Sequence, residues 1–309
     1  GAYSAGLNTR HTGNITIGKD IIFYDASNDR SSFEGIISGS ASLITINGNG
    51  TYNVNTGQGA RITFDNNSNT FNADMLVMAG KAFQFNATNA VNGNAIECNG
   101  DIVINSSVTT IPVMGSLSGS GRVSIHPATS ADATFSIGND NGNGVFSGII
   151  SDGGGDLSIT KVGTGTQLLN GTCTYSGSTT INNGVLGGTG NLSNSSVTII
   201  NSNGKIMGGT GTGNAGIFTV DDLEFANNST AAINVYSNGT NLSRIQVNGT
   251  CKLGTTSKVN LMQTMPAGTY NIISSTDTMN GTTPTVGINL SGRTASVSRP
   301  GRNLRVTLT

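Results

Sequence analysis

The sequence contains few charged residues, few aromatic residues and no tryptophan. Of its 309 residues, 10% are charged and 5% are aromatic, and the formal net charge is −1. A nucleic-acid-binding protein needs a basic surface, and 15 basic residues against 16 acidic residues do not provide one. We therefore expect no nucleic-acid partner.

Long hydrophobic runs and proline are also scarce. No apolar run approaches the roughly 18 residues of a membrane-spanning helix, so we predict no transmembrane segment. Collagen is excluded because the chain has only 5 prolines and its glycines show no period of three. Disorder is not expected either, because disorder requires low hydrophobicity with high charge and 35% of this chain is hydrophobic.

The sequence has only three cysteines, Cys98, Cys173 and Cys251, which is an odd number. They cannot all pair within one chain, so a framework of intramolecular disulfides is not expected. One interpretation is that all three are small buried residues. The alternative is that exposed thiols outside the cell form intermolecular cross-links between neighbouring subunits.

Glycine, asparagine, threonine and serine are abundant, and together they make up about half of the chain. Glycine interrupts nearly every long stretch of the sequence, and the apolar spacing typical of a helix is almost absent. Short runs that alternate apolar and polar residues between Gly, Asn or Asp predict strands that are half-buried on one face. The clearest runs are Asn14 to Gly18, Ala60 to Phe64, Asp101 to Asn105, Arg122 to Ile125, Ser196 to Asn201 and Lys258 to Leu261.

The spacing of the turn residues predicts how these strands are arranged. Turn clusters recur about every 6 to 12 residues, which is typical of a sandwich, a barrel or a β-helix. Internal repetition favours the β-helix, because Phe33 to Gly39 reads FEGIISG and Phe146 to Asp152 reads FSGIISD. We therefore predict an all-β fold, a right-handed parallel β-helix (β-solenoid), with its hand taken from the general crossover rule.

Coils of roughly 20 to 24 residues would give roughly 13 to 15 coils. The narrow interior predicts small or β-branched inward side chains. Residues 31–309 are expected to form one continuous solenoid. Residues 1–30 are expected either to cap it or to donate a strand, made of Asn14, Ile15, Thr16 and Ile17, to a neighbouring subunit.

One stretch, from Val145 to Leu186, follows a longer ordered pattern. It reads VFSGIISDGGGDLSITKVGTGTQLLNGTCTYSGSTTINNGVL and resembles the autotransporter-associated β-strand repeat, also called the passenger-associated transport repeat. The matching positions are Phe146, Gly148, Ile150, Leu157, Lys161, Gly163, Gly165, Thr166, Leu169, Gly171, Thr174, Tyr175, Gly177, Thr179, Ile181, Gly184 and Leu186. Cys173 stands where the family usually has Asn.

The C-terminal part, residues 248–309, is similar to the closing segments of such passengers. The membrane barrel in which autotransporters end is not part of this sequence, so the resemblance is to the passenger alone. It implies a β-helix at the cell surface or outside the cell, in a Gram-negative bacterium. The first 140 residues or so are compatible with the repeat without matching it.

The sequence shows no convincing active site. His11 and His126 are the only histidines, and no G-x-S-x-G elbow accompanies them. Asp222 and Glu224 share one face of a predicted strand and are the best candidates for the acid/base pair of a polysaccharide-active enzyme. Asp25, Asp29, Glu34 and Asp140 lie in partial calcium-loop patterns. We predict no catalytic, cofactor or metal site, and no enzyme activity.

The favoured hypothesis is a non-enzymatic extracellular structural protein. The ends of a solenoid expose unpaired backbone groups, so matching ends would stack head to tail into a filament, fibre or sheath. The expected partner is a second copy of the chain. Two alternatives stay open: an autotransporter-like adhesin that binds surface glycans or host cells, and a polysaccharide-active β-helix enzyme.

Overall fold

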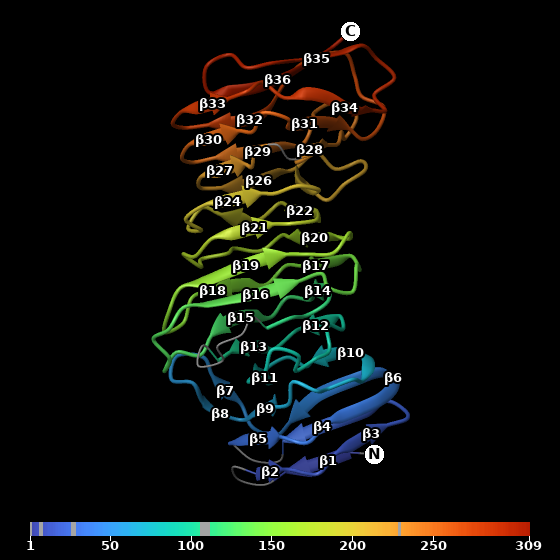
Figure 1. Cartoon of the computed structure of the whole chain (residues 1–309), viewed down its shortest axis with the longest axis vertical. Helices are drawn as coiled ribbons and strands as arrows, with labels where there is room; N and C mark the ends of the chain where they lie inside the picture. The colour runs from blue at the N-terminus through green and yellow to red at the C-terminus, as the bar shows by residue number, and fades with distance from the viewer. Residues whose placement is uncertain (1, 6–8, 26–28, 106–111, 228–229) are drawn as a thin grey trace. The chain divides into compact units, whose positions relative to one another are not determined.

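The chain is all-β in the computed structural model, which describes residues 2–5, 9–25, 29–105, 112–227 and 230–309 (Figure 1). Every regular element in these ranges is a strand, which confirms the all-β prediction. No helix in the described part is long and apolar enough to cross a membrane. The chain divides into two compact units, Gly1–Ile159 and Thr160–Thr309, and each is described separately below.

The strands predicted from alternating residues are all present. The six runs contain, in order, β3 (Ile15–Ile17), β9 (Arg61–Phe64), β13 (Asp101–Ile104), β15 (Arg122–Ile125), β24 (Thr198–Ile200) and β31 (Lys258–Leu261). The flanking Gly, Asn and Asp residues form the corners, as their tolerance of turn conformations requires.

Two parallel sheets hold most strands of the first unit. The β2 sheet runs, in spatial order, through β18 (Ile149–Ser151), β15, β13, β11 (Ala82–Phe85), β9, β5 (Arg30–Phe33) and β2 (Thr9–His11). The β1 sheet runs through β1 (Ala2–Ala5), β4 (Ile21–Asp25), β6 (Ile37–Gly48), β10 (Asn72–Val77), β12 (Ile96–Cys98) and β14 (Leu117–Ser118), with β3 also on β6. The unit also contains β7 (Tyr52–Asn53), β8 (Gln58–Gly59), β16 (Ala133–Ile137) and β17 (Gly144–Phe146).

From β4 to β15, apart from the β7 and β8 hairpin, successive strands of the chain belong alternately to these two sheets. Phe83 in β11 pairs with Ile62 on one side and with Ile102 on the other. A strand of the β1 sheet lies in each interval, β10 in the first and β12 in the second. Between two neighbouring strands of one sheet, the chain therefore forms a strand of the other sheet.

The interior of the first unit contains a cluster of phenylalanine side chains among its aliphatic residues. Phe33, Phe64 and Phe85 occupy successive positions of the β2 sheet and are fully buried. Phe23 contacts Phe33 and Phe64 edge to face at centroid distances of 4.7 and 4.9 Å. Buried isoleucine and valine still outnumber phenylalanine in this unit, so the expectation of small or β-branched inward residues is confirmed in part, and the interlocking rings are an addition that it did not include.

The hairpin of β7 and β8 packs beside the β2 sheet. Arg61 lies 5.9 Å from the centroid of the Tyr52 ring. Burial raises the pKa of Tyr52 to about 12. His126 Nδ1 accepts a hydrogen bond from the Ala128 N–H, so Nε2 carries the proton and donates to the Gly57 carbonyl at 3.1 Å. His126 therefore anchors the hairpin.

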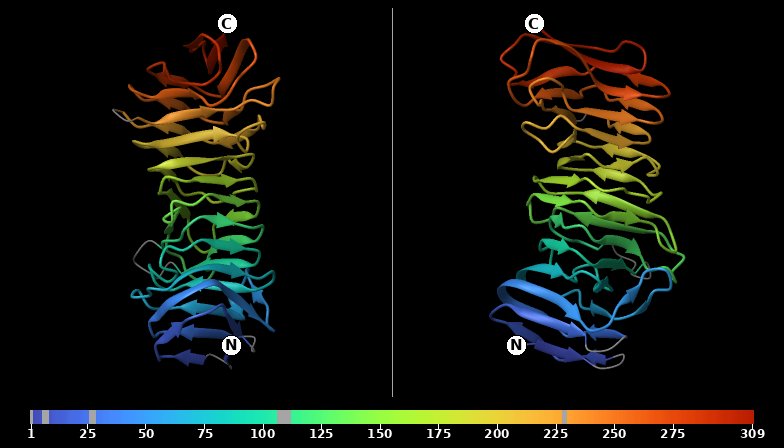
Figure 2. Two further views of the ribbon diagram at one scale, coloured as in Figure 1. Left: turned by 90° about the vertical axis from the view of Figure 1, so that its right-hand side faces the viewer. Right: turned by 180° about the vertical axis from the view of Figure 1, so that it is seen from behind.

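Three sheets build the second unit, which Figure 2 shows from two further sides. The β21 sheet contains β21 (Thr179–Ile181), β24, β27 (Leu223–Phe225), β30 (Cys251–Leu253) and β33 (Met279–Gly281). The β20 sheet contains β20 (Thr166–Leu169), β22 (Gly184–Gly188), β25 (Gly204–Gly208), β28 (Ala232–Val235), β31 and β34 (Thr285–Asn289). The β23 sheet contains β23 (Asn191–Leu192), β26 (Ile217–Val220), β29 (Arg244–Val247), β32 (Gly268–Ser275), β36 (Asn303–Leu308) and β35 (Ala295–Ser298). The remaining strand, β19 (Leu157–Lys161), spans the division between the units.

The sheets of the second unit are parallel except at the end of the β23 sheet. There β36 pairs antiparallel with β32, and β35 pairs antiparallel with β36. The sequence did not predict this closing hairpin. Along the β20 sheet, the inward column is aliphatic, with Leu186, Ile206, Ile233 and Val259 in register.

The repeat-like residues of the second unit form a buried hydrogen-bond network. The Tyr175 hydroxyl lies 2.6 Å from Thr179 Oγ1, which lies 3.0 Å from Ser195 Oγ. Lys161 is fully buried, and its ammonium donates to backbone carbonyls, including that of Gly163 at 3.0 Å. These polar residues therefore form hydrogen bonds with the buried backbone and with one another.

Candidate functional site

The segment predicted as a donated strand lies at an edge. Ile15–Ile17 forms β3, which pairs with Ile37–Gly39 of β6 in the same chain. Ile15 donates its N–H to Ile36 O at 2.9 Å, so the backbone of Thr16 faces the opposite side. Among the strands that the structure describes, only β6 pairs with β3. The outer edge of β3 therefore offers hydrogen-bonding groups to a further strand.

A second edge strand lies in the other unit. Within the described residues, β34 pairs only with β31. Ile288 on this strand and Leu290 just after it are 48% and 56% exposed, among the most exposed large apolar side chains of the described residues. Two exposed apolar side chains therefore lie beside a strand edge that no other described strand pairs with.

All three cysteines are buried free thiols. Burial raises the pKa of both Cys98 and Cys251 to about 12. Cys98 Sγ also donates to Gly100 O at 3.3 Å. The buried interpretation is therefore confirmed. Intermolecular cross-linking stays a prediction, and it would require these thiols to become exposed first.

The carboxylate pair suggested for acid/base chemistry is engaged in structural contacts. Asp222 lies just before β27 and accepts hydrogen bonds from Thr250. Glu224 forms an ion pair with Lys252 at 2.6 Å. Both carboxylates therefore link β27 to the segment of the next strand, β30.

The acidic residues of the partial calcium-loop patterns lie in different surroundings. Glu34 accepts from Arg10 through both oxygens at 2.6 and 2.8 Å, and this hydrogen bond lowers the pKa of Glu34. Asp140 accepts from the N–H and hydroxyl of Ser116. Asp29 accepts from the Arg30 N–H, and Asp25 is buried. No group of three or more His, Cys, Asp or Glu side chains in the described ranges is arranged to hold a metal ion.

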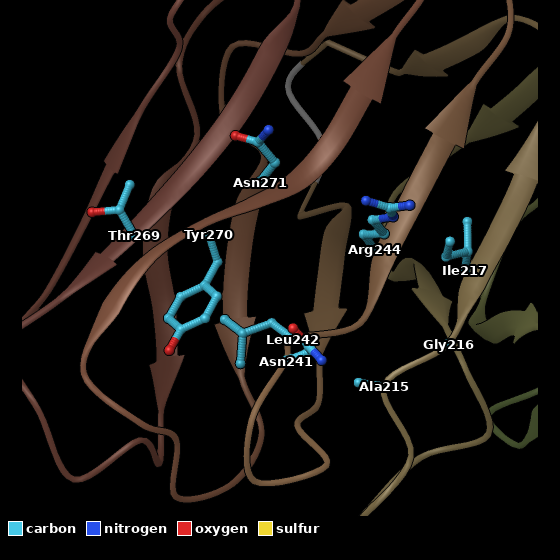
Figure 3. Close-up of a pocket in the computed structure, with 9 residues that line it drawn as sticks. All are labelled: Ala215, Gly216, Ile217, Asn241, Leu242, Arg244, Thr269, Tyr270 and Asn271. Carbon is cyan, nitrogen blue, oxygen red and sulfur yellow. The ribbon is translucent and has the colours of Figure 1, made fainter.

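A pocket lies on the β23 sheet of the second unit (Figure 3). Its volume is about 460 Å3, within the range of about 300 to 1,000 Å3 that small-molecule sites occupy. Strands β26, β29 and β32 contribute side chains to it, and the segments just before β26 and β29 complete it. Its lining residues are Ala215, Gly216, Ile217, Asn241, Leu242, Arg244, Thr269, Tyr270 and Asn271.

The side chains of this pocket combine one cation, amides and an aromatic ring. Arg244 stands beside Ile217, with which it pairs in register, and is exposed. Tyr270 and Leu242 lie next to each other on the opposite side of the pocket in Figure 3. The Tyr270 hydroxyl donates to Ala267 O at 3.0 Å, which holds the ring in place. No Asp or Glu lines the pocket.

Sequence reasoning missed this pocket. Its residues come from three segments, near 217, 244 and 270, whose proximity depends on the register of β26, β29 and β32. The lengths of the loops between these strands differ, so the sequence alone does not align the segments. The one available signal was an arginine within an otherwise uncharged run from 225 to 251.

No protein-family model matches the chain, and no curated protein sequence matches it.

Proposed function

We propose that the chain is a non-enzymatic structural protein of the cell exterior, folded as a right-handed parallel β-helix and assembling head to tail with copies of itself. The alternation of strands between parallel sheets supports the helical path. The right hand follows from the rule for parallel crossovers. The resemblance to autotransporter passengers supports a location at the surface of a Gram-negative bacterium or outside it.

The observation that carries the assembly proposal is the outer edge of β3. A strand edge with donors and acceptors facing outward is a template for another chain, and natural proteins cover or disrupt such edges unless they are used. The side chains of Ile15 and Ile17 already pack inward, at 9% and 4% exposure. An added strand would therefore extend an existing ladder without rearranging it.

The partner edge in the proposal is β34 of another copy. Its exposed Ile288 and Leu290 would lose contact with water on association, which favours binding. The contact joins different surfaces of two identical chains, so it repeats and produces a filament. The low net charge of −1 limits repulsion between copies.

The test compares the chain with its Thr16→Pro and Thr16→Val variants, by sedimentation velocity and negative-stain electron microscopy without reducing agent. Proline removes the outward N–H of residue 16 and spares the N–H of Ile15, which bonds β6. Valine keeps that N–H and matches the size of threonine. We expect filaments from the native chain and Thr16→Val, and at least a tenfold higher assembly concentration for Thr16→Pro.

Two results would overturn the proposal. Isolated particles at high concentration of the native chain would reject self-assembly. Equal assembly of the proline and valine variants, with unchanged melting temperatures, would reject the β3 edge as the contact.

A further inference from the structure

We propose that the pocket on the β23 sheet binds a carboxylate-bearing sugar, such as a hexuronic or sialic acid unit of a surface polysaccharide. This is a binding function in addition to the proposed assembly and does not depend on it. The argument rests on the charge, hydrogen-bonding capacity and shape of the side chains that line the pocket.

The charge of the pocket favours an anion. Arg244 is exposed at its wall, and no ion pair or side-chain hydrogen bond holds its guanidinium among the described residues. A second cation, Arg305, lies close by, because its Nε donates to Asn271 Oδ1 at 2.8 Å. Guanidinium groups match the planar geometry of carboxylates and bind them through paired hydrogen bonds.

The amide groups favour a ligand with hydroxyls as well as charge. The Asn271 oxygen is engaged by Arg305, so its Nδ2 remains to donate to a ligand. The side chain of Asn241 has both a donor and an acceptor and makes no side-chain hydrogen bond within the described part of the chain. A sugar hydroxyl both donates and accepts, so it can satisfy each of these groups.

The apolar part of the pocket favours a ring over a simple anion. The Tyr270 ring is anchored through its hydroxyl and lies beside Leu242, which is 6% exposed. A pyranose has an apolar face of C–H groups that can pack on an aromatic ring, and burying that face is favourable. Phosphate or acetate would leave this surface in water. A carboxylated sugar uses the cation, the amides and the ring together.

The experiment titrates the whole chain with sodium glucuronate and N-acetylneuraminate, and with glucose, acetate and inorganic phosphate as comparison probes. Saturation-transfer NMR detects weak complexes, and calorimetry measures the affinity. We expect at least one carboxylated sugar to bind at least tenfold more tightly than glucose and than either small anion. Added salt should weaken this binding.

Matched variants assign the binding to the pocket. Arg244→Gln should raise the dissociation constant at least tenfold, whereas Arg30→Gln, which removes the same charge from the first unit, should leave it unchanged. Tyr270→Leu should weaken sugar binding more than Tyr270→Phe, which keeps the ring and loses only its anchoring hydroxyl. Melting temperatures within a few degrees of the native value confirm that the variants are folded.

The outcomes separate this inference from the assembly proposal. Binding that survives in the Thr16→Pro variant supports a site independent of filament formation. Equal affinity for glucose and glucuronate would overturn the role of Arg244. Equal displacement by acetate or phosphate would show a simple anion site and overturn the sugar. An equal loss in Arg30→Gln and Arg244→Gln would overturn the location.

Discussion

Asp222 Oδ1 accepts two hydrogen bonds from Thr250, one from its backbone N–H at 2.7 Å and one from its hydroxyl at 2.8 Å. The two residues are 28 positions apart and lie just before neighbouring strands, β27 and β30. A carboxylate thus links the segments that precede two neighbouring parallel strands. Asp140 makes a related contact with Ser116, in which one carboxylate oxygen accepts from the backbone N–H and the other from the hydroxyl.

Removing this contact should destabilise the protein. Hydrogen bonds to charged groups contribute about 1.5 to 3 kcal/mol, so Asp222→Ala should lower the free energy of unfolding by about that amount in urea denaturation. Asp222→Asn keeps an acceptor oxygen and should cost less. Glu224→Gln breaks only an exposed ion pair and should change stability by less than about 1 kcal/mol. Equal losses in all three variants would contradict the structural role of Asp222.

Glycine at position 119 should be required for the close approach of its backbone to that of Cys98. Its φ is +98°, and an added Cβ would collide with the Cys98 carbonyl oxygen. Gly119→Ala should therefore lower stability by more than the roughly 1 kcal/mol of an unfavourable φ alone. Gly80 has a φ of +70° and open space, so Gly80→Ala reports the backbone strain by itself. In thermal melts, the melting temperature of Gly119→Ala should be well below that of Gly80→Ala.

The thiols should be inert in the folded protein. With burial raising the pKa of Cys98 and Cys251 to about 12, almost no thiolate forms at pH 8. Iodoacetamide should label fewer than one thiol per chain at pH 8 and all three after unfolding in guanidinium, as counted by intact-mass spectrometry. Rapid labelling of the native chain would show that these sulfurs reach solvent.

The stability that His126 contributes by anchoring the hairpin of β7 and β8 should depend on pH. Burial lowers the pKa of His126, the hydrogen bond to Gly57 O opposes this, and the Arg61 charge lowers it further. The unfolded chain then binds a proton near pH 6.5 that the folded chain excludes, so stability falls as pH drops below that value. Between pH 8 and 5, the native chain should lose more free energy of unfolding than His126→Gln. Parallel losses would exclude His126 as the titrating group.

Local sequence pattern predicted the strands because alternation reflects burial of one face. The bounds of Arg122–Ile125 and Lys258–Leu261 agree with the structure residue by residue. The pairing of strands that are distant in the sequence was harder to predict. The antiparallel closure by β36 depends on a turn near Pro300 to Asn303, and nothing in the alternation of Asn303 to Leu308 distinguishes it from a parallel strand.

The phenylalanine cluster of the first unit was not predicted, for a related reason. Phe64 and Phe83 lie in ordinary alternating runs, and their contact at 5.1 Å arises only when β9 and β11 are placed side by side. The same dependence on register hides the pocket, since Arg244 and Tyr270 come together through β29 and β32. Sequence therefore predicts elements well and sites built between elements poorly.

The hairpin of β7 and β8 has a consequence for how such chains can change over evolutionary time. Thr63 pairs with Ser32 across 31 residues, whereas Asn86 contacts Asp65 across only 21. The longer interval contains the hairpin, yet the register on both sides of β9 is intact. Extra residues in a connection between strands are thus accommodated without disturbing the pairing of neighbouring strands. Corners are accordingly the places where insertions are tolerated and where peptide tags can be grafted, while the strands must keep their length.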